Sequence, residues 1–211
     1  MPGSTGSHRP EGSRASTEDA FLDAAERLLI SAGHAGITTR LLAEEAGTNP
    51  GLVHYYFGSM DNLFVRVLER FTERLIVRHR EMYAADIPSL QKWRQAMRYL
   101  DVDRPYQKVW LELQALSWNH PHLRQRVAAV DEKWRAVLTE AFAAAREEFG
   151  IEMPLDALVS LVMTFNEGII LERLSGVETG QGELLDWIDK WLEGRQALSR
   201  RPTGTASEGD P

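Results

Sequence analysis

The stretch that decides the fold is Thr38–Leu63, with the sequence TTRLLAEEAGTNPGLVHYYFGSMDNL. Thr38 or Thr39 can begin a short helix, because a threonine hydroxyl accepts hydrogen bonds from the free N–H groups of the first turn. Gly47 ends this helix. Asn49-Pro50 is typical of the start of the next, with asparagine as the cap and proline at the first helical position. Two short helices joined by a tight turn predict a helix-turn-helix.

Helices on either side must cover this motif, because its two short helices cannot bury a core alone. Upstream, Ser16 and Asp19 match a capping box and predict a helix start. Gly33 is expected to end that helix as its C′ residue. Its apolar face consists of Phe21, Ala24, Ala25, Leu28 and Leu29. Downstream, Ser59 is expected to cap a fourth helix that carries Leu63, Phe64, Val67, Leu68, Phe71 and Leu75.

The rest of the chain also has helical spacing, and no alternating pattern typical of strands occurs. Prolines stand at four expected helix starts. The expected helices are 88–100, 105–118, 121–149, 154–175 and 181–198. The sequence therefore predicts an all-α chain with an N-terminal helix-turn-helix domain of three helices and a larger helical domain. The expected division is a disordered arm over 1–16, the helix-turn-helix over 17–60, the helical domain over 61–198 and a disordered tail over 199–211.

Composition sets broad limits on function. Of 211 residues, 43% are hydrophobic, which is ample for a packed core, and the net charge is −7. The absence of cysteine excludes disulfides and thiolate chemistry and fits a reducing cytosol. The most apolar stretch, 155–174, is interrupted by charged residues, so no membrane span is expected. We therefore expect a cytoplasmic protein.

The run Thr38–Leu63 resembles the signature of the tetracycline-repressor (TetR) family, and the resemblance covers about residues 17–68. The shared features are a Thr-capped helix, an Ala-Gly turn and a short recognition helix that ends in aromatic residues and Phe57. A serine, an acidic residue and a leucine follow. Two positions differ, because the family usually has Lys where this chain has Met60 and often Tyr where it has His54. The resemblance implies a transcriptional repressor that dimerises through its last two long helices and binds an inducer, and no enzyme.

The helix-turn-helix also suggests DNA contacts from its chemistry. A recognition helix must present small or polar residues at its N-terminal end to enter the major groove. Hydroxyl and imidazole donors suit phosphates, and an arginine suits a guanine edge. The expected DNA contacts are Thr39, Arg40, Thr48, Asn49, Pro50, Gly51, His54, Tyr55 and Tyr56. Tyr55 and Tyr56 can each serve as DNA contact or as core. The apolar Leu42, Ala43, Val53 and Phe57 are expected in the core.

The N-terminal part of the chain, residues 1–66, called the head below, has an unusual charge for a DNA-binding domain. Residues 1–66 contain five arginines, no lysine and eight carboxylates, a net charge of −3. Since counterion release scales with the number of phosphates neutralised, we expect a shallow salt dependence of DNA binding, with a log–log slope of about −4 or flatter per dimer. Arg9 and Arg14 either reach a minor groove or touch nothing. Arg66, Arg70, Arg74 and Arg78 favour a solvated, ion-paired face over a nucleic-acid stripe.

The last two long helices are apolar on most sides, which indicates that one face meets the core and the other a partner chain, or that both are internal. The expected dimer contacts are Leu155, Val159, Val162, Ile169, Ile170, Leu184, Trp187, Ile188 and Trp191. Aromatic and Met residues with a few polar groups in the middle of the chain suggest a ligand pocket. The expected ligand contacts are Trp93, Met97, Trp110, Gln114, Trp118, Met163, Asn166 and Glu167.

Two other function classes remain open on the sequence. The acidic head and Met60 favour a small-molecule sensor with weak or lost DNA binding. Buried polar groups and histidines suggest, more weakly, an all-helical enzyme. His120-Pro121-His122 is a poor metal site and a good helix junction, and Asp101-Val102-Asp103 is most simply a linker. No Gly-rich phosphate loop, nucleophile elbow or HExxH motif occurs, so we expect no cofactor and no metal.

Overall fold

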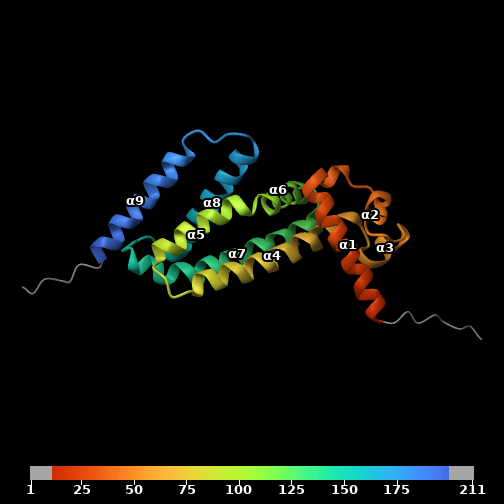
Figure 1. Ribbon diagram of the computed structural model, residues 1–211, viewed down its shortest axis with the longest axis horizontal. Helices are drawn as coiled ribbons and strands as arrows, with labels where there is room; N and C mark the ends of the chain where they lie inside the picture. The colour runs from red at the N-terminus through yellow and green to blue at the C-terminus, as the bar shows by residue number, and fades with distance from the viewer. Residues whose placement is uncertain (1–10, 200–211) are drawn as a thin grey trace, which may run out of the picture. The chain divides into compact units, whose positions relative to one another are not determined.

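The computed structural model describes residues 11–199, which form nine α-helices and one short 3-10 helix with no strand (Figure 1). The prediction of an all-α chain is confirmed. The elements are α1 (Glu11–Ala32), η1 (His34–Gly36), α2 (Thr39–Glu45), α3 (Gly51–Phe57), α4 (Met60–Ala84), α5 (Ser89–Val102), α6 (Arg104–Ser117), α7 (Pro121–Glu148), α8 (Leu155–Leu174) and α9 (Gln181–Ser199).

The N-terminal boundary differs from the prediction. Helix α1 begins at Glu11, so residues 11–16 are helical, where an arm and a helix start at Ser16 were predicted. A capping box permits a helix start but does not stop the helix from extending upstream, and Arg14 and Ala15 are good helix formers. Residues 1–10, which include Arg9 of the predicted arm, and residues 200–211 of the predicted tail lie outside the described residues.

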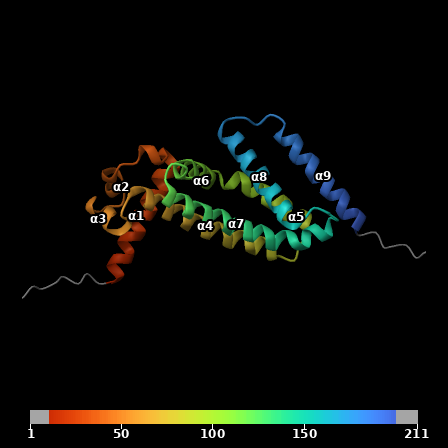
Figure 2. The same ribbon diagram turned by 180° about the vertical axis from the view of Figure 1, so that it is seen from behind.

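The chain divides into two compact units, one made of residues 1–74 and 105–130 and the other of residues 75–104 and 131–211. In the first unit, α1, α2 and α3 gather into one group in both ribbon views (Figures 1 and 2). The predicted domain boundary at residue 60 falls within this unit and remains a proposal.

The core of the first unit is built around Phe21 of α1, which is fully buried. Its ring meets that of Phe57 edge to face, with centroids 6.1 Å apart. Such aromatic pairs contribute roughly 0.5–1.5 kcal/mol beyond the area that they bury. Val53, Leu42 and Ala43 are also buried, so all four apolar residues expected in the core of the motif lie there.

Side-chain hydrogen bonds mark the starts of the short helices. Thr38 is the N-cap of α2, as predicted, whereas the N-cap of α3 is Pro50 and not the Asn49 expected there. The Thr38 hydroxyl accepts from the Leu41 N–H at 3.1 Å and the Asn49 amide oxygen accepts from the Gly51 N–H at 2.8 Å. The Ser59 hydroxyl accepts from the Asn62 N–H at 3.1 Å at the start of α4. Each bond satisfies a donor that the first helical turn leaves free.

In the second unit, α9 packs on α5. Leu90, Phe149 and Leu192 form a buried cluster, against which the partly buried Trp93 and Ile188 pack. Arg94 of α5 donates to both oxygens of Asp189 of α9, at 2.9 and 2.7 Å. These hydrogen bonds and the positive charge of Arg94 lower the pKa of Asp189. An apolar seam and a bidentate ion pair therefore hold α9 in place.

Gly33 ends α1, as predicted, in a backbone conformation with positive φ. Its N–H donates to the Leu29 carbonyl at 3.0 Å, with φ at 73° and ψ at 167°. Only glycine adopts this region readily. A Cβ here would also lie 2.9 Å from Oε1 of Glu112. The backbone conformation of this turn therefore favours glycine, and a side chain here would also have to displace the Glu112 carboxylate.

We expect Gly33→Ala to lower the free energy of unfolding by about 1–3 kcal/mol, the usual cost of this backbone region for a residue with a side chain. Gly36→Ala is the matched control, because its φ is not positive and its Cβ would meet only Ala32, at 3.4 Å. Urea denaturation followed by circular dichroism measures both. Equal losses in the two variants would contradict this account of the turn.

Candidate nucleic-acid interface and sensor interior

Helix α3 turns one face inward and leaves the other in solvent. Val53 and Phe57 are buried, whereas Tyr55 is 61% exposed and His54 is exposed beside it. At the start of the helix Asn49, Pro50 and Gly51 are exposed as well. A helix with this pattern presents polar groups outward over a rigid apolar base, which suits contact with a nucleic-acid groove.

The other predicted contacts have mixed exposure. Arg40 is exposed, and Thr39, Thr48 and Tyr56 are half-buried. The ring of Tyr56 lies 6.3 Å from that of Phe21 and meets the Tyr55 ring edge to face at 5.1 Å. Tyr56 therefore serves partly as core and supports the exposed ring of Tyr55.

Two predicted contacts also hold the local backbone. The amide oxygen of Asn49 accepts from the Gly51 N–H, and Nδ1 of His54 lies 3.0 Å from the Gly58 carbonyl at the end of the helix. Both side chains are exposed, so each can stabilise the motif and still offer its remaining polar atoms outward.

The arginines of α4 are ion-paired, as predicted, but mostly with other helices. Arg66 pairs with Glu69, which lies three residues further along α4, at 3.4 Å. Arg70 pairs with Asp23 at 2.8 Å and with Glu26 at 3.0 Å, and Arg74 also reaches Glu26. Protein carboxylates thus neutralise this stripe of arginines.

Arg40 stands apart from the other arginines of the head. Arg27, in the same group of helices, bonds Glu45 at 2.7 Å. Arg40 is exposed and has no ion pair within residues 11–199. Its positive charge is therefore directly open to a phosphate or a base.

Hydrogen bonds of charged side chains connect α6 to α1 and η1, and α7 to α4, within the first unit. The Glu112 carboxylate accepts from the backbone N–H of His34 at 2.9 Å, and Lys108 donates to the Ile30 carbonyl at 3.1 Å. Arg126 of α7 donates to both oxygens of Glu69 at 2.9 Å. Burial alone would raise the pKa of Glu69, but the hydrogen bonds and charge of Arg126 outweigh it and the pKa is lowered.

An aromatic group in the second unit was not predicted. The His79 ring lies 4.9 Å from the rings of both Tyr99 and Trp134, and its Nδ1 donates to the Leu75 carbonyl at 2.8 Å. Burial lowers the pKa of His79 and raises that of Tyr83. His79 and Tyr83 are four residues apart, and this spacing, visible in the sequence, places both side chains on the same face of a helix.

The same unit contains an unsatisfied polar group on α8. The side-chain oxygen of Asn166 is buried and has no hydrogen-bond partner among residues 11–199. Burial raises the pKa of its neighbour Glu167, and the charge of Asp131 raises it further. Burial is also the main reason for the raised pKa of Asp131. A buried acceptor without a donor costs stability and calls for an explanation, of which an absent ligand is one.

The remaining predicted ligand contacts are divided between the units. Trp110 is buried, Gln114 is half-buried and Trp118 is 63% exposed in the first unit. In the second unit, Trp93, Met97, Met163, Asn166 and Glu167 are all half-buried. Trp93 packs against the α5–α9 cluster.

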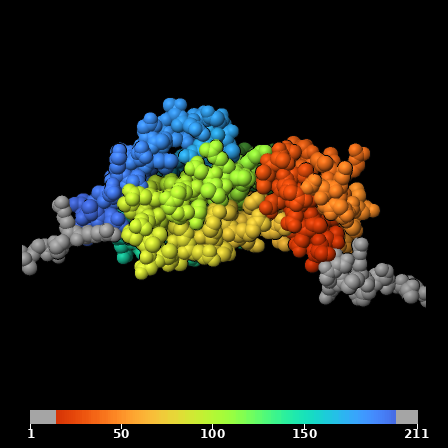
Figure 3. Space-filling model, in the orientation of Figure 1, coloured from red at the N-terminus to blue at the C-terminus, as the bar shows by residue number. Residues whose placement is uncertain are grey.

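The predicted dimer contacts differ in how far they are buried within the chain. Val159 and Ile169 of α8 are buried within the chain itself. Leu184, Trp187 and Trp191 of α9 are exposed, and Trp187 is 63% exposed. The half-buried members are Leu155, Val162, Ile170 and Ile188. Figure 3 shows α9, in deep blue, uncovered on the face in view.

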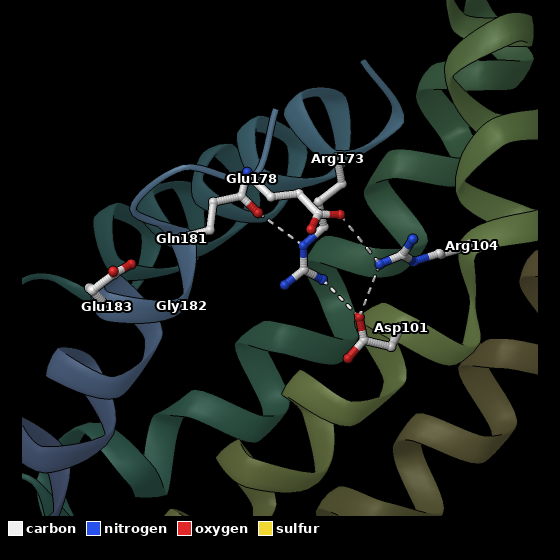
Figure 4. Close-up of a pocket in the computed structure, with 7 residues that line it drawn as sticks. All are labelled: Asp101, Arg104, Arg173, Glu178, Gln181, Gly182 and Glu183. Carbon is white, nitrogen blue, oxygen red and sulfur yellow. Dashed lines mark hydrogen bonds and ion pairs between the residues drawn. The ribbon is translucent and has the colours of Figure 1, made fainter. Parts of the chain in front are cut away.

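The segment predicted as a linker, Asp101-Val102-Asp103, is not one. It forms the end of α5 and its cap. Asp103 accepts a hydrogen bond from Arg78, and Asp101 accepts one from Arg173 at 3.2 Å. Asp101 also lines a cavity of about 420 Å³ at the connection from α8 to α9, called the α8–α9 cavity below (Figure 4).

The described residues contain neither a metal-binding cluster nor a membrane-spanning helix. No group of three or more His, Asp or Glu side chains comes together there to hold a metal ion, and the rings of His120 and His122 lie 6.0 Å apart. No described helix is both long and apolar enough to cross a membrane.

The fold and the exposed face of α3 define a helix-turn-helix regulatory protein. Residues 21–67 match the family model described as bacterial regulatory proteins, tetR family. The HTH-type transcriptional repressor AcnR of Corynebacterium glutamicum is 24% identical over 177 residues, which is 80% of this chain and 88% of the repressor.

Solved structures agree in fold. A putative transcriptional regulator from Rhodococcus sp. RHA1 has a TM-score of 0.70 at 19% identity, over 89% of this chain and 97% of its own. A putative regulator from Saccharomonospora viridis in complex with choline has a TM-score of 0.68 at 18% identity, over 86% and 95%. FadR from Bacillus subtilis in complex with stearoyl-CoA has a TM-score of 0.66 at 13% identity, over 82% and 96%. Residues 21–67 are therefore similar to the bacterial regulatory proteins of the tetR family, and the chain shares its fold with the solved regulators named here.

Proposed function

We propose that this regulator is a ligand-responsive repressor. It binds a pseudo-palindromic DNA operator as a homodimer in the cytoplasm, and a small-molecule inducer releases it. The observation that carries the proposal is the two-faced helix α3, whose buried Val53 and Phe57 hold His54 and Tyr55 outward. The proposed function does not include catalysis.

The proposed DNA contacts are those of the helix-turn-helix. Asn49, Pro50 and Gly51 open α3 with small or polar groups, and Arg40 adds an open positive charge. Two such helices about 34–36 Å apart match successive major grooves on one side of DNA. A symmetric dimer therefore explains why the operator would be pseudo-palindromic.

The proposed dimer interface lies on exposed faces of α8 and α9. On α8 the exposed Leu161 and Leu171 share a face with Thr164 and Gly168, and on α9 the exposed stripe is Leu184, Trp187, Trp191 and Leu198. The steps are three, four and three residues on α8 and three, four and seven residues on α9, which is the spacing of a helix-bundle seam. Since Val159 and Ile169 are already packed inside the chain, we place the interface on these stripes instead of on those two residues.

The proposed inducer site is centred on Asn166 and Glu167 of α8. An inducer with a hydrogen-bond donor would satisfy the free oxygen of Asn166. The choline and stearoyl-CoA complexes of proteins with the same fold support a ligand in a body of this kind. An inducer that favours a different spacing of the two recognition helices lowers DNA affinity by shifting the population of conformations.

A second candidate function is a small-molecule sensor with weak DNA binding. It is favoured by the acidic head, whose Arg27, Arg66, Arg70 and Arg74 are all paired with protein carboxylates. Met60, at the start of α4, offers no charge to a phosphate. DNA binding distinguishes the two functions.

In a mobility-shift assay on the intergenic DNA upstream of its own gene, we expect a specific complex with a log–log salt slope of about −4 or flatter. Arg40→Ala should weaken binding and flatten the slope by about one contact per protomer, because Arg40 has no protein partner. Arg27→Ala, which removes a paired arginine, is the control and should leave the slope unchanged. A steep slope, or no shift at low salt from a folded dimer, would favour the sensor.

We expect Asn166→Leu to raise the free energy of unfolding by about 1 kcal/mol, because it removes a buried acceptor that has no donor. The same variant should bind operator normally yet need at least tenfold more inducer for release. Denaturation and inducer titration of the DNA complex measure the two effects. An unchanged inducer requirement would place the inducer away from Asn166.

We expect Trp187→Glu to convert the dimer to monomers and abolish operator binding, since a charge would be buried in the proposed seam. Trp118→Glu is the matched control, because Trp118 and Trp187 are both 63% exposed and Trp118 lies outside α8 and α9. Analytical ultracentrifugation gives the mass of each variant. A dimeric Trp187→Glu protein would rule out the interface proposed here.

A further inference from the structure

Five residues with planar rings meet around His79 in the second unit, and they are called the His79 group below. His79 and Tyr83 lie on α4, Tyr99 on α5, and Trp134 and Phe142 on α7. The centroid of the His79 ring is 4.9 Å from those of Tyr99 and Trp134. The Tyr83 ring lies 6.4 Å from that of His79 and 6.3 Å from that of Phe142. Three helices therefore bring flat side chains together at one place.

The rings around His79 are not fully covered by the protein. His79 is 9% exposed, and the other four members of the His79 group are only half-buried. Helix α5, which carries Tyr99, has Leu90 as its single buried residue, although the structure describes this helix in full. A close-packed interior would bury aromatic side chains of this size. Apolar ring surface is therefore left open to a flat ligand that stacks on it.

His79 carries a hydrogen-bond acceptor that the protein leaves unused. Its Nδ1 lies 2.8 Å from the Leu75 carbonyl, which can only accept, so Nδ1 carries the ring hydrogen. Burial, the largest cause, lowers the pKa of His79 and keeps the ring uncharged at neutral pH. In such a ring Nε2 is an acceptor, and no residue among 11–199 donates a hydrogen bond to it. An acceptor in this state favours a ligand that brings a donor.

The charges next to the His79 group balance each other. The Arg78 guanidinium lies 4.1 Å from the centroid of the Tyr99 ring and donates a hydrogen bond to Asp103. The charge of Arg78 lowers the pKa of His79, and the charge of Asp103 raises it. Because each of these charges already has its counter-charge, an ionic ligand would lose its hydration without gaining a partner. The surroundings of His79 therefore favour an uncharged ligand.

We propose that the His79 group binds an uncharged, planar aromatic molecule that carries a hydrogen-bond donor, such as a phenol or an indole. The aromatic ring of the ligand stacks against Tyr99 and Trp134, and its O–H or N–H donates to Nε2 of His79. His79 is thus the residue that makes the site specific for a donor. This inference rests on the proposed function for the role of the ligand as inducer, and it names the class of that inducer.

The test is a titration of the full-length protein, without DNA, followed by saturation-transfer NMR of the probes. Two matched pairs of probes are used, p-cresol with 4-methylanisole and indole with 1-methylindole. Within each pair a methyl group replaces the donated hydrogen and the aromatic ring stays the same. We expect p-cresol and indole each to bind about tenfold more tightly than the methylated probe, because the methylated probe leaves the His79 acceptor unpaired.

Variants of His79 locate the site. His79→Phe keeps a ring and removes the acceptor, so it should abolish the preference for the donor-bearing probe. His79→Gln keeps an acceptor and should retain the preference in part. The preference is a ratio measured within one variant, so a loss of stability does not obscure it. Tyr99→Leu should weaken both probes of a pair by a similar factor. His122→Phe is the matched control, because His122 is exposed and lies outside the second unit.

Three results would overturn the proposal. The first is that neither p-cresol nor indole binds, or that each binds no better than its methylated partner. The second is a preference for the donor that His79→Phe leaves unchanged, which would place the probe elsewhere. The third is tighter binding of benzoate or benzylamine than of p-cresol, which would make the site one for ions. A failed operator assay would count against the proposed function alone, because none of these measurements uses DNA.

Discussion

The contact between Phe21 and Phe57 is the constraint on which the rest of the head depends. Phe57 ends α3 and meets Phe21 edge to face in the middle of the first unit. Because Phe57 and Val53 lie four residues apart on one face, fixing them inside the core forces the intervening residues outward. The exposed positions of His54 and Tyr55 follow from this packing, and so does the partial burial of Tyr56 against the same Phe21.

Charge inside the first unit is used mainly to join helices. Glu26 forms ion pairs with Arg70 and Arg74, and Glu69 forms one with Arg126. The Glu112 carboxylate accepts a hydrogen bond from the backbone N–H of His34, just after α1. Each pair is partly desolvated and each links residues far apart in sequence. The same pairing leaves little positive charge open for phosphates, so affinity for DNA would rest on shape, on hydrogen bonds and on the open Arg40.

Helix α8 illustrates how one helix can serve several purposes. Val159 and Ile169 are packed within the chain, Leu161 and Leu171 are exposed, and Asn166 carries an unsatisfied oxygen. At its end, Arg173 contributes to the α8–α9 cavity. Leu161 and Leu171 lie on one face of α8, whereas Asn166 and Arg173, seven residues apart, lie about two turns from each other on the opposite face.

The sequence by itself determined the helices and the motif. Capping residues such as Thr38 and Ser59, the apolar spacing and the Thr38–Leu63 run act over a few residues, so they can be seen without a fold. The tertiary structure alone decided which face of α8 is buried and which charges pair. Arg94 and Asp189 are 95 residues apart, His34 and Glu112 are 78 apart, and Arg173 and Asp101 are 72 apart. No local pattern encodes such pairs, because the helices that bring them together pack through apolar surfaces that several arrangements could satisfy.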